Sequence, residues 1–285
     1  MMLKFSVNEG IYGKESLKKS ITRIANFGYD GVELAGEPHI LKVKNVTNLL
    51  EAFGLEISSI CGIYTIDRDL SNTDSLKRAD GIQYVKDCIT FASDLNAKIV
   101  IVVPSPIGKK RSTIPLFEEW KLACESIYEL GQFAADLGVQ LVVEALNRYE
   151  TYLVNKIGQA LKLCNEVGLE TVGVMIDTFH MNIEDNSIPD AIRKIGNKLF
   201  HVHIADSNRE AAGFGHIDFN SILKALIEIN YNGYITMEFV TPKSEMFGKN
   251  TSLSGNEMFN LHTSQSINHI KKTLSQILTP THIEV

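Results

Sequence analysis

Four apolar runs in the second half of the sequence each end in an acidic or histidine side chain. These side chains are Glu144, Asp177, His203 and Glu238, at the ends of the runs LVVE, VMID, FHVH and ITME. A single acid in such a place usually caps a helix or forms a salt bridge. Four such residues in succession are different, because converging carboxylates repel one another unless protons or a cation neutralise them. The pattern therefore predicts a divalent metal site.

The donor atoms indicate which ion would bind. Carboxylate oxygens with one imidazole suit Mn²⁺, Mg²⁺ or Co²⁺ better than a closed structural zinc site, which favours thiolates. We expect Mn²⁺ first, with Co²⁺ or Mg²⁺ as alternatives. Strand alternation puts His201 and His203 on one face, with His203 about 6 to 7 Å nearer the carboxyl end of the strand. His203 is therefore the expected ligand, and His201 is expected to be a satisfied interior histidine.

Three further polar residues closely follow the first three of these runs. Glu150 comes six residues after the acid of the first run, His180 three after the acid of the second, and Arg209 six after the histidine of the third. Taken singly, each is an ordinary surface residue. Their coincidence with three strand ends predicts loop side chains that reach a substrate held on the metal.

A repeated phrase organises the chain around these residues. An amphipathic helical segment, a Gly or Asn, and a short apolar run recur seven times, for example in ANFGYDGVEL and ADLGVQLVVE. The Gly or Asn supplies the left-handed residue that ends a helix, and the runs suit strands that are covered on both faces. The expected closing residues are Gly28, Gly54, Asn96, Gly138, Gly168, Gly196 and Gly233. With the initial LKFSV, the pattern predicts eight strands that alternate with helices.

Eight such strands form either an open doubly wound sheet or a closed barrel. No GxGxxG phosphate motif follows the first strand, so we predict an α/β fold of the (β/α)8 barrel class. No linker divides the chain, and residues 1–285 are expected to form one domain. The active site of such a barrel lies at the carboxyl ends of its strands. Residues 61–73, 104–115 and 239–258 follow strand ends and are candidates for its lid and walls.

The composition argues against several classes of protein. With a net charge of −6 the chain has no basic field of the kind that binds phosphate backbones, so nucleic acid is not an expected partner. The amino terminus lacks the apolar core of a signal peptide, and no apolar run approaches the roughly 18 residues of a membrane helix. We therefore expect a cytoplasmic protein. The cysteines, Cys61, Cys88, Cys124 and Cys164, show no CxxC spacing and are expected to be free thiols.

At the polar residues described above, the sequence resembles the ketose 3-epimerases. These are the D-tagatose 3-epimerase and D-psicose (D-allulose) 3-epimerase family of the xylose isomerase-like TIM barrel superfamily. The similar segments are VEALNRYETYLVN, DTFHMNIEDNSI, HVHIADSNRE and MEF, with SSICGIYTIDRDL as a further match. They extend over most of the chain from the third expected strand onward. The resemblance implies metal-dependent epimerisation of free ketoses at C3.

The resemblance also implies a role for each polar residue. Its metal ligands would be Glu144, Asp177, His203 and Glu238. Glu144 and Glu238 would in addition be the catalytic acid/base pair, one removing a proton from C3 and the other returning a proton to the opposite face through a cis-enediolate. The O1 to O3 end of the sugar would be held by Glu150, His180 and Arg209. A homodimer or homotetramer active in carbohydrate metabolism is implied as well.

Some segments depart from the family pattern. The loop NEGIYG lacks the aromatic wall of family members, Ala212 stands where they usually have Pro, and EFVTPKSEMFGKN is not a close match. These departures bear on the preferred sugar more than on the chemistry.

Other functions are compatible with parts of the pattern. An aldose–ketose isomerase would share the barrel and metal but move a proton between C1 and C2, and inosose dehydratase-like chemistry is a further relative. An apurinic endonuclease of the same superfamily would need more ligands and a basic face, which this acidic chain lacks. A barrel that binds without catalysis would need no metal, so metal analysis separates it from an enzyme.

Overall fold

The computed structural model describes residues 3–241 and 254–279, and its strands form one closed parallel barrel in the order β1 to β8. The strands are β1 (Lys4–Asn8), β2 (Gly31–Ala35), β3 (Glu56–Cys61), β4 (Ile99–Val102), β5 (Gln140–Val143), β6 (Val172–Asp177), β7 (Leu199–Ile204) and β8 (Tyr234–Met237). Pairing of Phe5 in β1 with Ile235 in β8 closes the barrel. The predicted (β/α)8 fold is confirmed.

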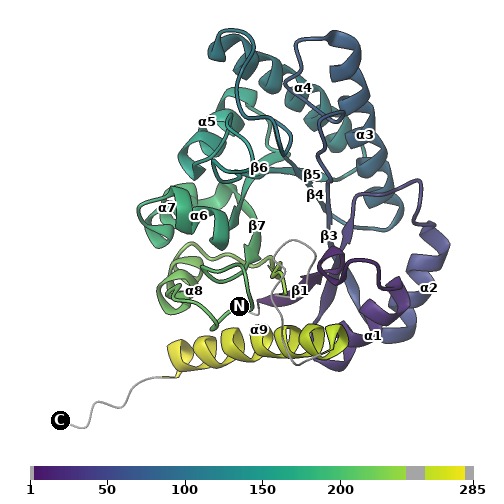
Figure 1. Cartoon of the computed structure of the whole chain (residues 1–285), viewed down its shortest axis with the longest axis vertical. Helices are drawn as coiled ribbons and strands as arrows, with labels where there is room; N and C mark the ends of the chain where they lie inside the picture. The colour runs from purple at the N-terminus through teal and green to yellow at the C-terminus, as the bar shows by residue number, and fades with distance from the viewer. Residues whose placement is uncertain (1–2, 242–253, 280–285) are drawn as a thin grey trace.

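Helices surround the barrel on its outside (Figure 1). They are α1 (Leu17–Asn26), α2 (Val43–Phe53), α3 (Ser75–Asp94), α4 (Leu116–Asp136), α5 (Ile157–Val167), α6 (Thr178–Glu184), α7 (Ile188–Ile195), α8 (Phe219–Glu228) and α9 (Gly255–Leu278), with short 3-10 helices at Glu9–Tyr12 and Gly196–Lys198. Because α6 and α7 both lie between β6 and β7, the chain has one helix more there than simple alternation predicts.

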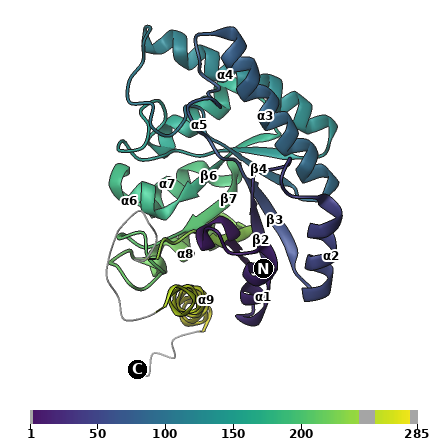
Figure 2. The same ribbon diagram turned by 45° about the vertical axis from the view of Figure 1, so that its right-hand side comes forward.

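The last described helix, α9, completes the outer layer next to α8 and near α1, and Figure 2 shows it end-on. Polar bonds attach it to the first part of the chain. The Tyr12 hydroxyl lies 2.7 Å from the hydroxyl of Thr263, and the Tyr29 hydroxyl donates to the Thr263 carbonyl at 2.7 Å. Arg23 of α1 donates to Asn260 at 2.7 Å. The first and last parts of the described chain therefore contact each other through α9 as well as through the pairing of β1 with β8.

Six of the seven expected helix-closing residues have a positive φ, although Gly196 combines it with a ψ of −130°, outside the left-handed helical region. Gly28, Gly54, Asn96, Gly138, Gly168 and Gly196 have φ between 57° and 74°. The prediction for Gly233 is wrong, because Asn230 closes α8 with φ of 57°. Asparagine tolerates this conformation, so the turn ends before Gly233. Close packing explains the glycine instead, since an added Cβ would lie 2.5 Å from the Tyr231 hydroxyl.

The strands also carry two distinct groups of buried side chains apart from the main core. One is apolar and consists of Ile99, Ile101, Val142 and Met175. The other is polar and consists of Ser6, Glu33, Ser59, His201 and Thr236, which are joined by hydrogen bonds. Because buried polar groups need partners, this network allows the strands to carry polar side chains inside the protein.

The structure also bears on the predictions for the cysteines, for membrane helices and for the number of domains. All four cysteines are free, as expected. Among the described residues, none of the helices combines the length and the apolar character needed to cross a bilayer. The assignment of residues 1–285 to one domain stays a prediction, because residues 1–2, 242–253 and 280–285 lie outside the described part of the chain.

Candidate metal centre and active site

The strand ends bring the four expected ligands together. Glu144 directly follows β5, Asp177 ends β6, His203 lies next to the end of β7, and Glu238 directly follows β8. Asp177 and His203 are register partners on adjacent strands. One potential ligand atom from each of the four residues lies within 4.8 Å of every other. The convergence predicted from spacing is therefore present, and a cation could bind there.

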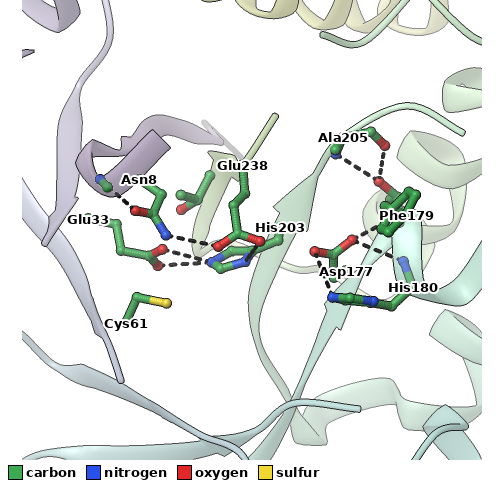
Figure 3. Close-up of polar contacts among 12 residues, drawn as sticks. Asn8, Glu33, Cys61, Asp177, Phe179, His180, His203, Ala205 and Glu238 are labelled. Atoms are coloured by element: carbon green, nitrogen blue, oxygen red, sulfur yellow. Dashed lines mark hydrogen bonds and ion pairs between the residues drawn. The ribbon is translucent and has the colours of Figure 1, made fainter. Parts of the chain in front are cut away.

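Two atoms of this cluster are buried without a hydrogen-bond partner among the described residues. One is Oδ2 of Asp177 and the other is Nδ1 of His203. The second carboxylate oxygen of Asp177 caps α6 by accepting from the backbone N–H groups of Phe179 and His180, at 2.7 and 3.3 Å (Figure 3). Leaving a buried polar atom unpaired is costly. An ion at the cluster would satisfy both atoms, so the residues fit a metal.

Burial and mutual repulsion control the charges of the cluster. Burial, followed by the charge of Glu238, raises the pKa of Glu144 well above its usual range. Burial is also the main cause that raises the pKa of Asp177. Burial opposes ionisation of Glu238 too, but the charges of His203 and Arg209 lower its pKa to about 2. It is therefore unfavourable for all three carboxylates to be ionised together unless a cation neutralises their charges.

The three predicted loop residues also lie at this end of the barrel, in one hydrogen-bonded group. Arg209 donates to Glu150 at 2.9 Å, and its other terminal nitrogen lies 4.0 Å from Glu238. Asn147 donates from its side chain to the same Glu150 oxygen at 3.0 Å and lies 2.8 Å from Nδ1 of His180. Asn147 was not predicted, although it lies in the segment that carries the resemblance.

The contacts of Asn147 determine which nitrogen of His180 carries the proton. The backbone N–H of Asn147 donates to Nδ1 of His180 at 3.2 Å. An N–H group can only donate, so Nδ1 must accept and the proton of a neutral ring lies on Nε2. This Nε2 lies 3.9 Å from the unpaired Oδ2 of Asp177. His180 therefore presents a hydrogen-bond donor beside the metal cluster.

Arg209 has an uncommon backbone conformation for a residue with a side chain. Its φ is 61°, in the left-handed region, and such residues concentrate at functional sites. The guanidinium lies 4.9 Å from the centre of the Phe179 ring. The two contacts to Glu150 and Phe179 hold the charge of Arg209 next to the cluster. Phe179 was another residue that the sequence did not identify.

A cavity of about 430 Å³ opens over these residues. Glu144, Glu150, His180, Arg209 and Glu238 line its polar side, and Ile63, Tyr64, Ile66, Val103, Ile107 and Leu146 are among the residues of its apolar side. The expected walls at 61–73 and 104–115 contribute Ile66 and Ile107. The third expected wall, 239–258, falls largely outside the described residues. A larger cavity of about 750 Å³ lies at the opposite end of the barrel, away from the cluster.

His201 and Glu33 are buried next to His203, one of the four expected metal ligands. His201 is buried, and its Nε2 is 2.9 Å from Glu33, 3.2 Å from Thr236 and 3.3 Å from Ser59, which confirms a satisfied interior histidine. Burial opposes ionisation of Glu33, but the charge of His203 and hydrogen bonds from both histidines hold its pKa well below the usual range. Glu33 was not predicted. The one signal for it was a single acid inside the apolar run GVELA.

Known proteins are similar to this chain in sequence and structure. A sequence model of the xylose isomerase-like TIM barrel family matches residues 21–259. D-psicose 3-epimerase of Ruminiclostridium cellulolyticum is 31% identical over 228 residues, 78% of this chain and 77% of that protein. A 3-dehydro-D-guloside 4-epimerase of Escherichia coli is 28% identical and covers 83% and 92%. The crystal structure of a D-psicose 3-epimerase with D-tagatose from Clostridium cellulolyticum superposes with a TM-score of 0.86, at 25% identity and over 95% and 99% of the two chains.

Proposed function

The chain belongs to the ketose 3-epimerases of the xylose isomerase-like TIM barrel family, and we propose that it uses a divalent cation to epimerise free ketoses at C3. The observation that carries this proposal is the convergence of Glu144, Asp177, His203 and Glu238 within 4.8 Å of one another. Two of these residues have buried atoms that need a partner. The site thus combines a place for a cation with two carboxylates that are able to move protons.

The cation would be held by those four residues. When bound, it supplies a Lewis acid that polarises the ketose carbonyl and neutralises the charge that develops when C3 loses its proton. The donor set of oxygens and one imidazole supports Mn²⁺, with Co²⁺ or Mg²⁺ as alternatives. Metal analysis of the purified protein tests this identity.

The two glutamates are the proposed proton carriers. Glu144 and Glu238 extend from β5 and β8, and β6 and β7 lie between these strands in the barrel order. Their carboxylates can therefore approach a bound sugar from different sides. One removes the C3 proton, the other returns a proton to the opposite face, and the roles exchange with the direction of reaction.

The loop residues would hold the end of the sugar next to the carbonyl. His180 offers the Nε2–H donor to a sugar oxygen, Arg209 offers charged donors, and Glu150 accepts from a sugar hydroxyl. Their mutual hydrogen bonds keep these groups in place before the substrate arrives, which lowers the entropy lost on binding.

A product assay tests the reaction. Mn²⁺-loaded protein is incubated with free ketohexoses and ketopentoses, and products are separated by chromatography. Conversion of fructose to psicose supports the 3-epimerase, whereas an aldose product identifies the isomerase alternative. A 3-keto glycoside belongs in the panel, because the similar Escherichia coli protein is a 3-dehydro-D-guloside 4-epimerase.

The oligomeric state is a separate part of the proposal. We expect a homodimer or homotetramer, as the family resemblance implies. Light scattering coupled to size-exclusion chromatography measures the mass in solution, and a mass near the 31.7 kDa of one chain would contradict it.

A further inference from the structure

We propose that Glu33 is a positioning residue that fixes the ring orientation and tautomer of His203, so that Nδ1 of His203 is free to bind the metal. This inference rests on the proposed function, because it concerns one ligand of the proposed metal site. It assigns a role to a residue in β2, on the other side of the barrel from the four strands that supply the ligands.

The contacts of Glu33 are those of a buried acceptor. Its carboxylate is fully buried, with one oxygen 2.9 Å and the other 3.0 Å from Nε2 of His203. Figure 3 shows the imidazole of His203 between Glu33 and Glu238. An ionised carboxylate can only accept hydrogen bonds, so Nε2 of His203 carries a proton in this contact.

The same contact determines what the other ring nitrogen can do. Nδ1 of His203 is 3.3 Å from Oε2 of Glu238 and has no hydrogen-bond partner among the described residues. When the Nε2–H donates to Glu33, a neutral ring keeps its lone pair on Nδ1, next to the other proposed ligands. A carboxylate behind a metal-binding histidine orients the ring and increases its basicity as a ligand.

Glu33 is itself held in place by other donors. The Ser59 hydroxyl of β3 donates to Oε2 of Glu33 at 2.5 Å, and Nε2 of His201 lies 2.9 Å from the same oxygen. The carboxylate therefore has little freedom to rotate away from His203. Several strands are joined at this one group, which makes it a rigid support.

A second interpretation of the same residues is a metal site of their own. Glu33, His201 and His203 could also supply three ligand atoms to a cation. The hydroxyls of Ser59 and Thr236 already lie within hydrogen-bond distance of these groups. We therefore favour hydrogen bonding, and the number of ions bound per chain separates the two interpretations.

Three variants test the role of Glu33. Glu33→Gln keeps the shape but removes the charged acceptor, and Glu33→Asp keeps the charge but withdraws it by one methylene. Glu119→Gln is the matched control, because Glu119 is also a buried glutamate but bonds to Ser71 and Lys109 instead. Circular dichroism and thermal unfolding verify that each variant is folded.

Metal affinity is the first measurement, by competition with a chromophoric chelator for Mn²⁺. We expect Glu33→Gln and Glu33→Asp to bind Mn²⁺ about 10- to 100-fold more weakly than the wild type, and Glu119→Gln to bind like the wild type. The second measurement is nitrogen NMR of histidine-labelled protein loaded with Mg²⁺. In the wild type, His203 should be protonated at Nε2 and not at Nδ1, and its N–H signal should shift in Glu33→Gln.

The outcomes distinguish this inference from the proposed function. Wild-type protein that binds no Mn²⁺, Co²⁺ or Mg²⁺ would refute the proposed metal site and the inference with it. Wild-type protein that binds one ion, together with variants of unchanged affinity and unchanged histidine signals, would refute the role of Glu33 alone. Two ions per wild-type chain, with the Nε2–H signal of His203 lost, would also overturn it, because Nε2 of His203 would then be a ligand.

Discussion

The mouth of the barrel has two unlike sides. On one side, Glu144 and Asp177 extend directly from strand ends and are 6% and 2% exposed. On the other side, Ile66 and Ile107 belong to the loops after β3 and β4 and are 59% and 49% exposed. The comparison indicates a division of labour. The proposed metal ligands, two of which are the proposed proton carriers, are built on strand ends, whereas the apolar residues of the mouth are built on loops.

The loop side is held together by its own ion cluster. Nζ of Lys109 lies 2.6 Å from Asp69, 2.5 Å from Glu119 and 2.9 Å from the Ser71 hydroxyl. Asp69 and Ser71 belong to the loop after β3, Lys109 to the loop after β4, and Glu119 to α4. The two apolar walls are therefore joined to each other, and the join does not depend on the metal cluster.

The largest expected effect lies on the strand side. Glu238→Gln and Glu144→Gln keep the side-chain size but remove the proposed proton carriers, so kcat should fall by at least about 10²- to 10⁴-fold. Activity is measured at saturating Mn²⁺, with metal content determined in each variant, so that lost metal is not mistaken for lost catalysis. Near-native turnover in Glu238→Gln would contradict the two-carboxylate scheme.

A smaller effect is expected from the groups between the two sides. His180→Ala removes a proposed hydrogen-bond donor to the substrate, and kcat/KM should fall about 10- to 100-fold, with KM raised and kcat lowered. Asn147→Ala should have a weaker effect in the same direction, because the backbone N–H of residue 147 still donates to His180. Equal losses in both variants would show that the side chain of Asn147 has a role of its own.

The sequence predicted the strand side better than the loop side. Repeated helix-closing residues and apolar runs predicted the barrel, and a barrel requires successive strand ends to meet. Glu144, Asp177 and His203 could therefore be placed near one another without a structure. Gly233 was misassigned, because either Asn or Gly can close a helix and both occur in INYNGYITME.

Long-range partners explain what the sequence did not reveal. Glu33 contacts histidines that are 168 and 170 residues away, and spacing along the chain carries no sign of such a contact. The Lys109 cluster joins residues that lie 38 and 40 apart, in loops of no regular pattern. Likewise, the sequence did not reveal that the side chain of Asn147 contacts both Glu150 and His180.

Replacing Lys109 tests whether the loops that bear the apolar wall can be disturbed without a loss of kcat. Lys109→Met leaves two buried carboxylates without their cation and should lower the free energy of unfolding by about 3 kcal/mol or more. In the folded variant KM should rise several-fold while kcat is retained, because the walls move and the strand ends do not. Urea denaturation and steady-state kinetics measure the two effects.

Lys110→Met is the control. Lys110 is exposed and contacts only backbone carbonyls among the described residues. The free energy of unfolding of this variant should differ from that of the wild type by no more than about 0.5 kcal/mol.

The apolar wall should give the smallest effect. Ile66→Ala and Ile107→Ala each remove apolar surface that is already half in water, so KM should change by about 10-fold or less and kcat should stay the same. The change should be larger for ketohexoses than for ketopentoses, because the longer sugar extends further from the carbonyl toward the loops. A large loss of kcat with either variant would mean that the loops help to place the reacting carbon. Both sides of the mouth would then contribute to the chemical step.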